Sequence, residues 1–310
     1  MSTRPLWLAG ATATGKSAVA ILLAEHLHGE IISVDSMQVY RGLDIGTAKP
    51  NAADQRRVRH HLIDVAELTQ PFDAAQFVRS ANEAVKEIQA RGRRPIFCGG
   101  TGLYFKAFLD GLGEAPPADA ALRAKLEATP LVELLDELSQ KDPATFEKID
   151  RQNPRRVIRA VEVIRLTGKP FSAQRSEWPK QNKTGEAPPM IWGLARQPAD
   201  LHARINERVD GMFEHGLVAE VKKLLEQGLE QNRAAMQAIG YRQVVEHLRG
   251  EHSLAQTIEL VKIRTRQFAK RQLTWFRRQL PMNWIECEAR ETAEAVASRM
   301  IALKDFPHGQ

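Results

Sequence analysis

The segment Gly10-Ala11-Thr12-Ala13-Thr14-Gly15-Lys16-Ser17 decides the fold of this chain. Residues 6–9 before it are apolar and few enough for one buried strand, and residues 17–27 after it repeat apolar side chains with helical spacing. Two glycines, four intervening residues and Lys-Ser form the P-loop pattern, in which backbone N–H groups surround a phosphate. The start of the helix adds partial positive charge, Lys16 adds an ammonium group, and the Ser17 hydroxyl is a ligand for Mg²⁺. We therefore predict that residues 10–17 bind a group that carries a pyrophosphate.

Polar groups follow two further strand-like segments. Residues 30–34 are rich in β-branched side chains and lead to Asp35, and residues 94–98 lead to Gly99-Gly100-Thr101-Gly102. A shorter strand is expected at 61–65, and helical spacing of apolar residues predicts a helix over 74–90. This alternation predicts a P-loop NTPase-like α/β fold, a parallel sheet with flanking helices whose ligands bind at the carboxyl ends of the strands. We therefore expect the P-loop, Asp35 and Thr101 to face one crevice.

The second half of the chain departs from this alternation. Prolines at 116 and 117 precede helical stretches, and the polar residues 168–189 are expected to form a loop before a strand at 189–195 returns to the sheet. From residue 199 to about 299 the pattern predicts helices throughout, with a turn at 238–240. The expected parts are a P-loop α/β core of residues 1–112 and 189–235, a helical insertion of 113–188, C-terminal helices of 236–303, and a frayed tail of 304–310.

Composition excludes several classes of protein. With 310 residues and 43% hydrophobic content, the chain has the profile of a soluble globular protein and no apolar run as long as a membrane span. Residues 1–5 lead directly to the first strand, so we expect no signal or transit peptide and a cytoplasmic location. Cys98 and Cys287 have no CxxC spacing, which argues against a disulfide framework and a zinc site.

Positive charge is concentrated near the C-terminus. The net charge is +6, and residues 260–285 contain no acidic side chain. On a helix, Lys262, Arg266, Lys270 and Arg277 form one stripe, and Arg264, Arg271 and Arg278 form a second. Like charges repel each other unless an anion lies nearby, so the pattern indicates a polyanionic partner. The alternative is a solvated basic face.

Asp35 and the glycine segment each allow more than one interpretation. Asp35 could order Mg²⁺, act as a general base for an acceptor near the phosphates, or cap a helix without chemistry. The glycines around Thr101 form either a flexible turn or a place where a ligand approaches the backbone closely. The position of Asp35 on the strand after the P-loop helix favours contact with the acceptor.

The arginines are similarly ambiguous. Arg204 and Arg208, with Arg196 upstream, could clamp a phosphate, or could pair with Glu207 and Asp210. Arg155 and Arg159 share one face of a helix that begins at Pro154, and they either grip a phosphate or belong to an amphipathic surface.

Several longer motifs carry a family resemblance. They are residues 10–17, Asp35-Ser36-Met37-Gln38-Val39-Tyr40-Arg41-Gly42-Leu43-Asp44-Ile45-Gly46-Thr47-Ala48-Lys49-Pro50, and residues 99–104, 155–162, 239–243 and 269–277. Over nearly its whole length the sequence resembles the tRNA dimethylallyltransferases, also called tRNA isopentenyltransferases. Ala11 departs from the pattern, since the family usually has Pro there, and the change affects the stiffness of the loop rather than a contacting group.

The resemblance implies a prenyl transfer. The dimethylallyl group of dimethylallyl diphosphate would move to N6 of the adenosine on the 3′ side of the tRNA anticodon. The P-loop and Mg²⁺ near Ser17 would hold the diphosphate leaving group, and Arg208 would clamp it. Asp35 would accept the proton of N6, and Thr101 would orient N6 by a hydrogen bond.

The resemblance also implies where tRNA binds. The anticodon-loop adenosine must be flipped out of its stack to reach such a crevice. The matching positions are Ser36, Met37, Gln38, Arg123, Arg155, Arg156, Val157, Ile158, Arg159, Gln237, Ala238, Ile239, Gly240, Tyr241, Arg242, Lys270, Arg271, Gln272, Leu273, Thr274, Trp275, Phe276 and Arg277. Trp275 and Phe276 either stack on a base or belong to the core. The expected partners are the anticodon stem-loop and dimethylallyl diphosphate, with no membrane and a monomeric chain.

Two other functions remain open at this level. A small-molecule or nucleotide kinase would use the P-loop for ATP and Asp35 for an acceptor hydroxyl, but it leaves the basic C-terminal segment unexplained. The second is an RNA-binding protein that is switched by a nucleotide and catalyses no reaction.

Overall fold

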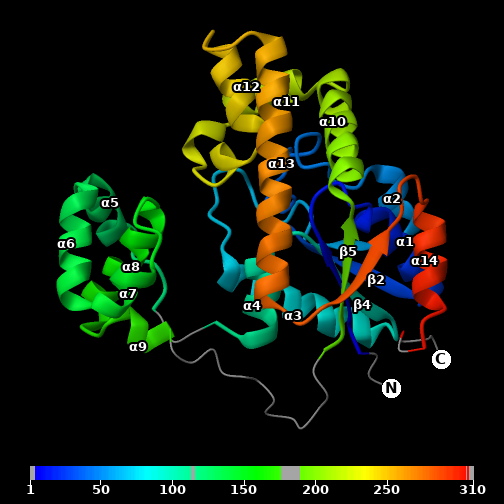
Figure 1. Ribbon diagram of the computed structural model, residues 1–310, viewed down its shortest axis with the longest axis horizontal. Helices are drawn as coiled ribbons and strands as arrows, with labels where there is room; N and C mark the ends of the chain where they lie inside the picture. The colour runs from blue at the N-terminus through cyan, green and yellow to red at the C-terminus, as the bar shows by residue number, and fades with distance from the viewer. Residues whose placement is uncertain (1–3, 113–115, 176–188, 305, 307–310) are drawn as a thin grey trace. The chain divides into compact units, whose positions relative to one another are not determined.

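The chain divides into two compact units, shown in Figure 1. The computed structural model describes residues 4–112, 116–175, 189–304 and 306. One unit comprises residues 1–106 and 188–310, and the other comprises residues 107–187. The helical insertion expected at 113–188 thus corresponds to a unit that begins earlier, inside helix α4 (Gly102–Asp110).

The larger unit contains the predicted parallel sheet. Its six strands run in the order β3-β2-β4-β1-β5-β6, and every neighbouring pair is parallel. The strands are β1 (Leu6–Gly10), β2 (Gly29–Val34), β3 (His60–His61), β4 (Arg94–Gly99), β5 (Ile191–Arg196) and β6 (Asn283–Cys287). Because β2, β4 and β1 are adjacent, the segments that follow them meet at one edge of the sheet.

Alternating side chains of β1 anchor helices on both faces of the sheet. Leu6 and Leu8 are buried with α1 (Lys16–His26) and α14 (Ala293–Ile301) on one face. Trp7 points to the other face, where its ring stacks on Phe97 with centroids 4.0 Å apart. Phe105 of α4 and Phe276 of α13 (Leu254–Gln279) extend this aromatic layer, with ring centroids 5.9 Å apart. Helix α3 (Ala74–Ala90) also packs against β2 and β4.

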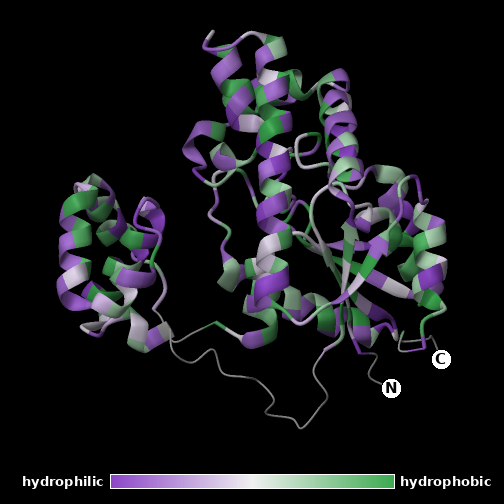
Figure 2. Ribbon diagram, in the orientation of Figure 1, coloured by the Kyte–Doolittle hydropathy of each residue, from purple (hydrophilic) through white to green (hydrophobic). Residues whose placement is uncertain are grey.

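The long helix α13 has a clear sequence signal at each end. Ser253 caps its N-terminus in a capping box with Gln256, and Pro281 follows its last residues. Figure 2 shows hydrophilic and hydrophobic residues alternating along α13, as in an amphipathic helix. Val261, Ala269 and Phe276 are buried on its inner face.

The expectation of helices throughout residues 199–299 is wrong at residues 283–287, which form strand β6. Its residues pair in parallel register with β5, and Ile285 and Cys287 enter the core beside α1 and α14. With only two inward apolar residues, so short a strand gives a weak alternating pattern after a long helix. Phe306, expected in a frayed tail, is also buried and packs against Trp192 with ring centroids 6.0 Å apart.

A second hydrophobic cluster of the larger unit lies beyond the sheet. It joins the segment after β2 to α10 (Pro198–Glu214), α11 (Leu217–Glu226), the short helices η1 (Leu229–Gln231) and η2 (Ala235–Gln237), and α12 (Tyr241–Leu248). Tyr40, Leu43 and Tyr241 are fully buried in it. Helix α2 (Ala52–Arg57), which the sequence pattern did not indicate, begins at an Asn51 cap.

The smaller unit is helical, as the sequence predicts. It contains α5 (Ala120–Ala128), α6 (Leu131–Lys141), α7 (Pro143–Lys148), α8 (Pro154–Thr167) and α9 (Phe171–Arg175) around a core of its own. Helix α9 occupies part of the stretch expected to be a loop, and residues 176–188 of that stretch lie outside the described residues. Within the described ranges, no helix combines the length and the hydropathy needed to cross a membrane.

Candidate active site

Two arginines hold the carbonyl groups of the P-loop from behind. Arg204 donates a hydrogen bond from Nε to the carbonyl of Ala13 at 3.0 Å, and Arg196 donates from Nε to the carbonyl of Thr14 at 2.9 Å. A trans peptide points its N–H away from its C=O, so the N–H groups of Thr14 and Gly15 face the opposite side. The arginines therefore orient the amides of the loop toward the space in front of it.

Those amides form an anion-binding cradle. The backbone N–H groups of residues 13–17 donate to none of the residues that the structure describes. Unpartnered amides at the start of a helix, with the helix dipole behind them, attract an anionic ligand. The N–H of Thr12 differs, because it donates to Oε1 of Gln272 at 2.9 Å. A row of unpartnered amides is thus present at residues 13–17, and binding of a pyrophosphate by residues 10–17 stays a prediction.

Two cationic side chains converge on the cradle. Burial lowers the pKa of Lys16 from its ordinary value of 10.5; Arg208 lowers it further, while Cys98 and Asp35 act in the opposite direction. Burial likewise lowers the pKa of the Arg208 guanidinium, and Asp35 opposes this shift. Arg208 forms no ion pair or hydrogen bond within the described part of the chain. Partly desolvated cations without a paired carboxylate favour binding of an anion between them.

The contacts of α10 do not support the salt-bridge alternative for Arg204 and Arg208. Asp210 pairs with Lys262 at 2.7 Å rather than with Arg204 or Arg208. Arg196 is the arginine that forms an ion pair, with Asp200 at 2.9 Å. Neither Arg204 nor Arg208 is therefore an exposed salt-bridge residue of α10.

Asp35 combines a structural contact with a free oxygen. Its Oδ1 accepts the backbone N–H of Met37 at 2.8 Å and that of Gln38 at 3.2 Å, so the carboxylate caps the turn after β2. Its Oδ2 accepts no hydrogen bond from any residue that the structure describes. Capping and chemistry are therefore compatible, because each uses a different oxygen of the same carboxylate.

Thr101 stands next to Asp35 at the end of β4. Its Oγ1 accepts the backbone N–H of Ser36 at 3.2 Å. A threonine hydroxyl also has one hydrogen to donate, and here it donates to no other described residue. The three groups expected from the sequence, the P-loop, Asp35 and Thr101, thus lie at one edge of the sheet.

The glycines around Thr101 were expected to form a flexible turn or to let a ligand approach the backbone, but two of them lie against side chains of α13. A side chain at position 100 would collide with Gln272, and one at position 102 would collide with the ring of Trp275. The close approach that these glycines permit is therefore the docking of α13, at least at these two positions. Trp275 is half-buried on Gly102, and Phe276 belongs to the core.

The segment after Asp35 is fixed by an internal network. The Gln38 side chain donates to the carbonyls of Thr47 and Ala48 at 3.2 and 3.3 Å, and it accepts the hydroxyl of Ser33 at 2.9 Å. The buried ammonium of Lys49 contacts Asp44 and Asp64 at 2.6 Å each. A cavity of about 590 Å³ lies beside this segment, and Arg208 contributes to its wall.

The basic helix α13 is divided between internal and exposed charges. Near its N-terminus, Lys262 pairs with Asp210, and Arg266 donates to the Asn206 side chain at 2.6 Å. Near its C-terminus, the exposed positions among the expected tRNA contacts are Lys270, Arg271, Thr274 and Arg277. Of the residues of the two basic stripes, Lys262 and Arg266 are engaged in internal contacts, whereas the exposed ones are Arg264, Lys270, Arg271, Arg277 and Arg278, four of which lie in the C-terminal half of the helix.

Other positions in the expected tRNA set have internal roles. Tyr241 is fully buried and donates to Glu220 at 2.6 Å, and Val157 lies in the core of the helical unit. Arg123 and Arg159 both bind the buried carboxylate of Glu162, at 2.6 and 2.7 Å. A tRNA contact at these segments stays a prediction, which depends on exposed neighbours such as Arg155, Arg156, Gln237 and Arg242.

The donor set suits a hard cation held partly by substrate. Ser17 is exposed at the start of α1, and its hydroxyl has no hydrogen-bond partner among the described residues. No cluster of three or more His, Cys, Asp or Glu side chains with metal-binding geometry occurs in the described ranges. Mg²⁺ commonly uses one or two protein oxygens together with phosphate oxygens and water, which fits a hydroxyl beside the row of unpartnered amides at residues 13–17.

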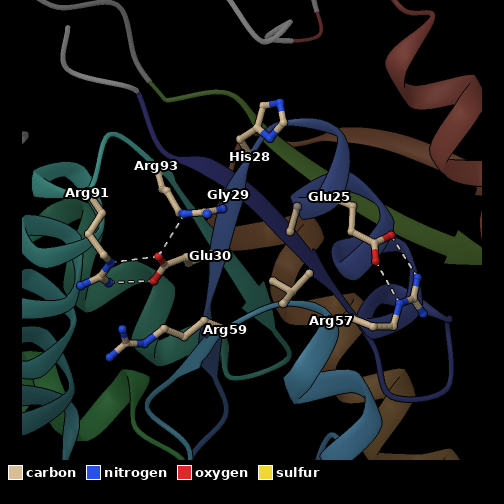
Figure 3. A pocket seen from close by; sticks show the side chains of 10 residues that line it. Glu25, His28, Gly29, Glu30, Arg57, Arg59, Arg91 and Arg93 are labelled. Carbon is tan, nitrogen blue, oxygen red and sulfur yellow. Dashed lines mark hydrogen bonds and ion pairs between the residues drawn. The ribbon is translucent and has the colours of Figure 1, made fainter.

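A second cavity, of about 370 Å³, lies at the amino edge of the sheet (Figure 3). Glu25 binds Arg57 at 2.9 Å, and Glu30 binds Arg91 at 2.7 Å and His61 at 2.7 Å. Burial raises the pKa of Glu30, but hydrogen bonds from Arg91 and His61 outweigh it and lower the pKa below 4.5. Arg57 and Arg91 stand at the C-termini of α2 and α3, where cations offset the helix dipole. These charges are therefore structural.

For three residues of the site, the sequence did not predict the contacts that they make with the P-loop. Arg196 and Arg204 support the P-loop carbonyls, and Gln272 reaches the loop from a helix far away in the sequence. Arg196 is the last residue of β5 and Arg204 lies in α10 directly after it, and the predicted return of this strand to the sheet was the sequence signal that could have placed them near the P-loop. No local pattern indicates the contact of Gln272.

Comparisons with known proteins identify the family of this chain. The family model described as IPP transferase matches residues 38–279. A protein of Trichlorobacter lovleyi named tRNA dimethylallyltransferase 1 is 46% identical over 92% of this chain and 94% of its own length. A tRNA dimethylallyltransferase of Geobacter sulfurreducens is 43% identical over 98% of this chain and 97% of its own length.

Solved structures of the same family are similar to this chain over most of its length. The full-length tRNA isopentenylpyrophosphate transferase of Bacillus halodurans superimposes with a TM-score of 0.69 and 38% identity, covering 96% of this chain and 94% of that one. A eukaryotic dimethylallyltransferase acting on tRNA gives a TM-score of 0.82 and 28% identity, covering 100% of this chain and 81% of that one. This chain therefore belongs to the tRNA dimethylallyltransferase, or IPP transferase, family and is a prenyltransferase.

Proposed function

We propose that this protein transfers the dimethylallyl group of dimethylallyl diphosphate to N6 of the adenosine on the 3′ side of a tRNA anticodon. The observation that carries the proposal is the meeting of an unpartnered carboxylate oxygen, Oδ2 of Asp35, with the cations Lys16 and Arg208 beside a row of free amides. Such a site holds a departing anion on one side and receives a proton on the other. Membership in a prenyltransferase family overturns both the kinase and the nucleotide-switch alternatives.

The reaction divides between two sets of groups. The bond between the allylic carbon and the diphosphate oxygen breaks, and the negative charge that develops there is stabilised by the amides of residues 13–17, Lys16 and Arg208. N6 forms the new bond to the allylic carbon, and its proton passes to Oδ2 of Asp35. The Thr101 hydroxyl hydrogen-bonds to the adenine and orients N6. The products are N6-dimethylallyl adenosine and diphosphate.

A magnesium ion is part of the proposal. The Ser17 hydroxyl would hold it beside the diphosphate, and the ion would supply further stabilisation of the leaving-group charge. The protein groups described above remain responsible for binding, orientation and proton acceptance.

The direct test is analysis of nucleosides. Unmodified tRNA is incubated with the protein, Mg²⁺ and dimethylallyl diphosphate, digested, and examined by mass spectrometry. We expect one dimethylallyl group on adenosine next to the anticodon, and none when ATP replaces the prenyl donor. Phosphate transfer from ATP, or unchanged tRNA with every donor, would contradict the proposal.

The exposed basic residues in the C-terminal half of α13 support the proposal that this helix binds tRNA. Lys270→Ala is expected to weaken tRNA binding and to reduce the slope of log K against log salt by about 1, because one phosphate contact is lost. The measurement is a binding titration at several salt concentrations. Lys222→Ala, which removes an exposed lysine from α11, is the matched control and should leave the slope unchanged. An unchanged slope for Lys270→Ala would remove this helix from the interface.

A further inference from the structure

Gln272 connects the two loops that flank the proposed reaction centre. Its Oε1 accepts the N–H of Thr12 at 2.9 Å, and its Nε2 donates to the carbonyl of Gly100 at 2.9 Å. Thr12 belongs to the P-loop, and Gly100 directly precedes Thr101. One side chain thus spans the gap between the diphosphate cradle and the hydroxyl that faces the acceptor.

The orientation of this carboxamide is determined by its partners. The amide of Thr12 can only donate, and the carbonyl of Gly100 can only accept, so the oxygen and nitrogen of Gln272 cannot be exchanged. The side chain is only 9% exposed, and Gly100 leaves just enough room for it. It therefore has little freedom to turn toward a ligand in solvent.

Helix α13 gives Gln272 a fixed base. Trp275 packs on Gly102 and Phe276 packs on Phe105, so the same turn of α13 also contacts helix α4, which begins at the end of the glycine segment. Both hydrogen bonds of Gln272 go to backbone atoms, so they set the separation of the two loops rather than the position of one side chain.

We propose that Gln272 is a positioning residue of the transferase: its carboxamide sets the distance between the P-loop and Gly100, and with it the distance between the leaving group and the acceptor. This inference rests on the proposed function. It assigns Gln272 a role different from the tRNA contact implied by the family resemblance. A misplacement of about 1 Å between reacting groups lowers a rate by about 10²-fold, so small changes of this separation are sufficient.

The test compares Gln272→Met with Gln272→Glu. Methionine keeps the length and most of the volume but forms neither hydrogen bond, whereas glutamate still accepts from Thr12 and loses the donor to Gly100. We expect kcat of Gln272→Met to fall by about 10- to 100-fold at saturating substrates, with a Kd for tRNA within about twofold of the unsubstituted protein. Gln272→Glu should also lose kcat, because the Gly100 carbonyl then faces a second acceptor.

The control and the contrary outcomes separate the possibilities. Gln279→Met, on the exposed end of α13, should leave kcat, KM and the Kd for tRNA unchanged. Weakened tRNA binding with unchanged kcat at saturation would make Gln272 an RNA contact and overturn the inference. Unchanged kcat in both Gln272 variants would overturn it as well. If Gln272→Met does not fold, as judged by its thermal transition, the isosteric Gln272→Glu decides. No prenylated adenosine from the unsubstituted protein would instead reject the proposed function.

Discussion

Asp35→Asn is expected to lower the rate of prenyl transfer by about 10²- to 10⁴-fold, the range found when a general base is removed. Asparagine has the same shape as aspartate, and its Oδ1 can still accept the N–H groups of Met37 and Gln38, so the turn after β2 should persist. The amide nitrogen that replaces Oδ2 can only donate and cannot take the proton of N6. Single-turnover measurement at saturating tRNA and prenyl donor isolates this step.

The same variant separates catalysis from structure. Its Kd for tRNA and its thermal transition should match those of the unsubstituted protein, because no protein hydrogen bond is lost. Glu207→Gln, which neutralises an exposed carboxylate on α10, is the control for loss of one negative charge near the site and should keep full activity. A large loss of tRNA binding in Asp35→Asn would mean that the carboxylate serves the fold or the interface.

The meeting of the P-loop, Asp35 and Thr101 at one edge of the sheet could be predicted from sequence because it follows from the direction of the strands. The P-loop, Asp35 and Thr101 each come directly after a strand, and parallel strands place their carboxyl ends at one edge. No contact between distant segments is needed for that inference. It therefore held even though strand β6 and helix α2 were not expected.

The contacts that complete the site could not be predicted, because they join distant segments. Thr12 and Gln272 are 260 residues apart in the chain, and no periodicity records such a pair. The glycine segment illustrates the same limit, since its sequence is interpreted as a flexible turn or as a place where a ligand approaches the backbone. At Gly100 and Gly102 the approaching group is α13 of the protein itself.

Family motifs mix residues of the fold with residues of the surface. The motif at 269–277 contains the exposed Lys270 and Arg277 together with the buried Gln272 and Phe276. Helical spacing explains the mixture, because residues three or four apart share a face while their neighbours point elsewhere. A motif match therefore predicts an interface for a whole segment, and burial decides which of its side chains can reach a partner.

Lys16→Ala is expected to lower kcat/KM for dimethylallyl diphosphate by about 10²- to 10³-fold, the effect of removing one donor from a site of developing charge. The Lys16 ammonium contacts the carbonyl of Ala11 at 3.2 Å, a weak partner that a diphosphate would displace. The measurement is steady-state kinetics with saturating tRNA, supported by calorimetric titration of inorganic diphosphate. Binding of diphosphate that is unaffected by the substitution would place the anion outside the cradle.

Lys16→Arg tests how the affinity for diphosphate depends on pH. Burial lowers the pKa of Lys16 in the free protein below 10.5, so the ammonium loses its proton at a lower pH than an exposed lysine. Diphosphate requires the charged form, so its affinity should be full at neutral pH, fall as pH rises through the lowered pKa, and be accompanied by proton uptake. Arginine stays protonated throughout this range, so Lys16→Arg should weaken or abolish the alkaline decrease even if its affinity at neutral pH is lower. An identical alkaline decrease in Lys16→Arg would assign the titration to another group, because the only charge that differs in its capacity to lose a proton is that at position 16.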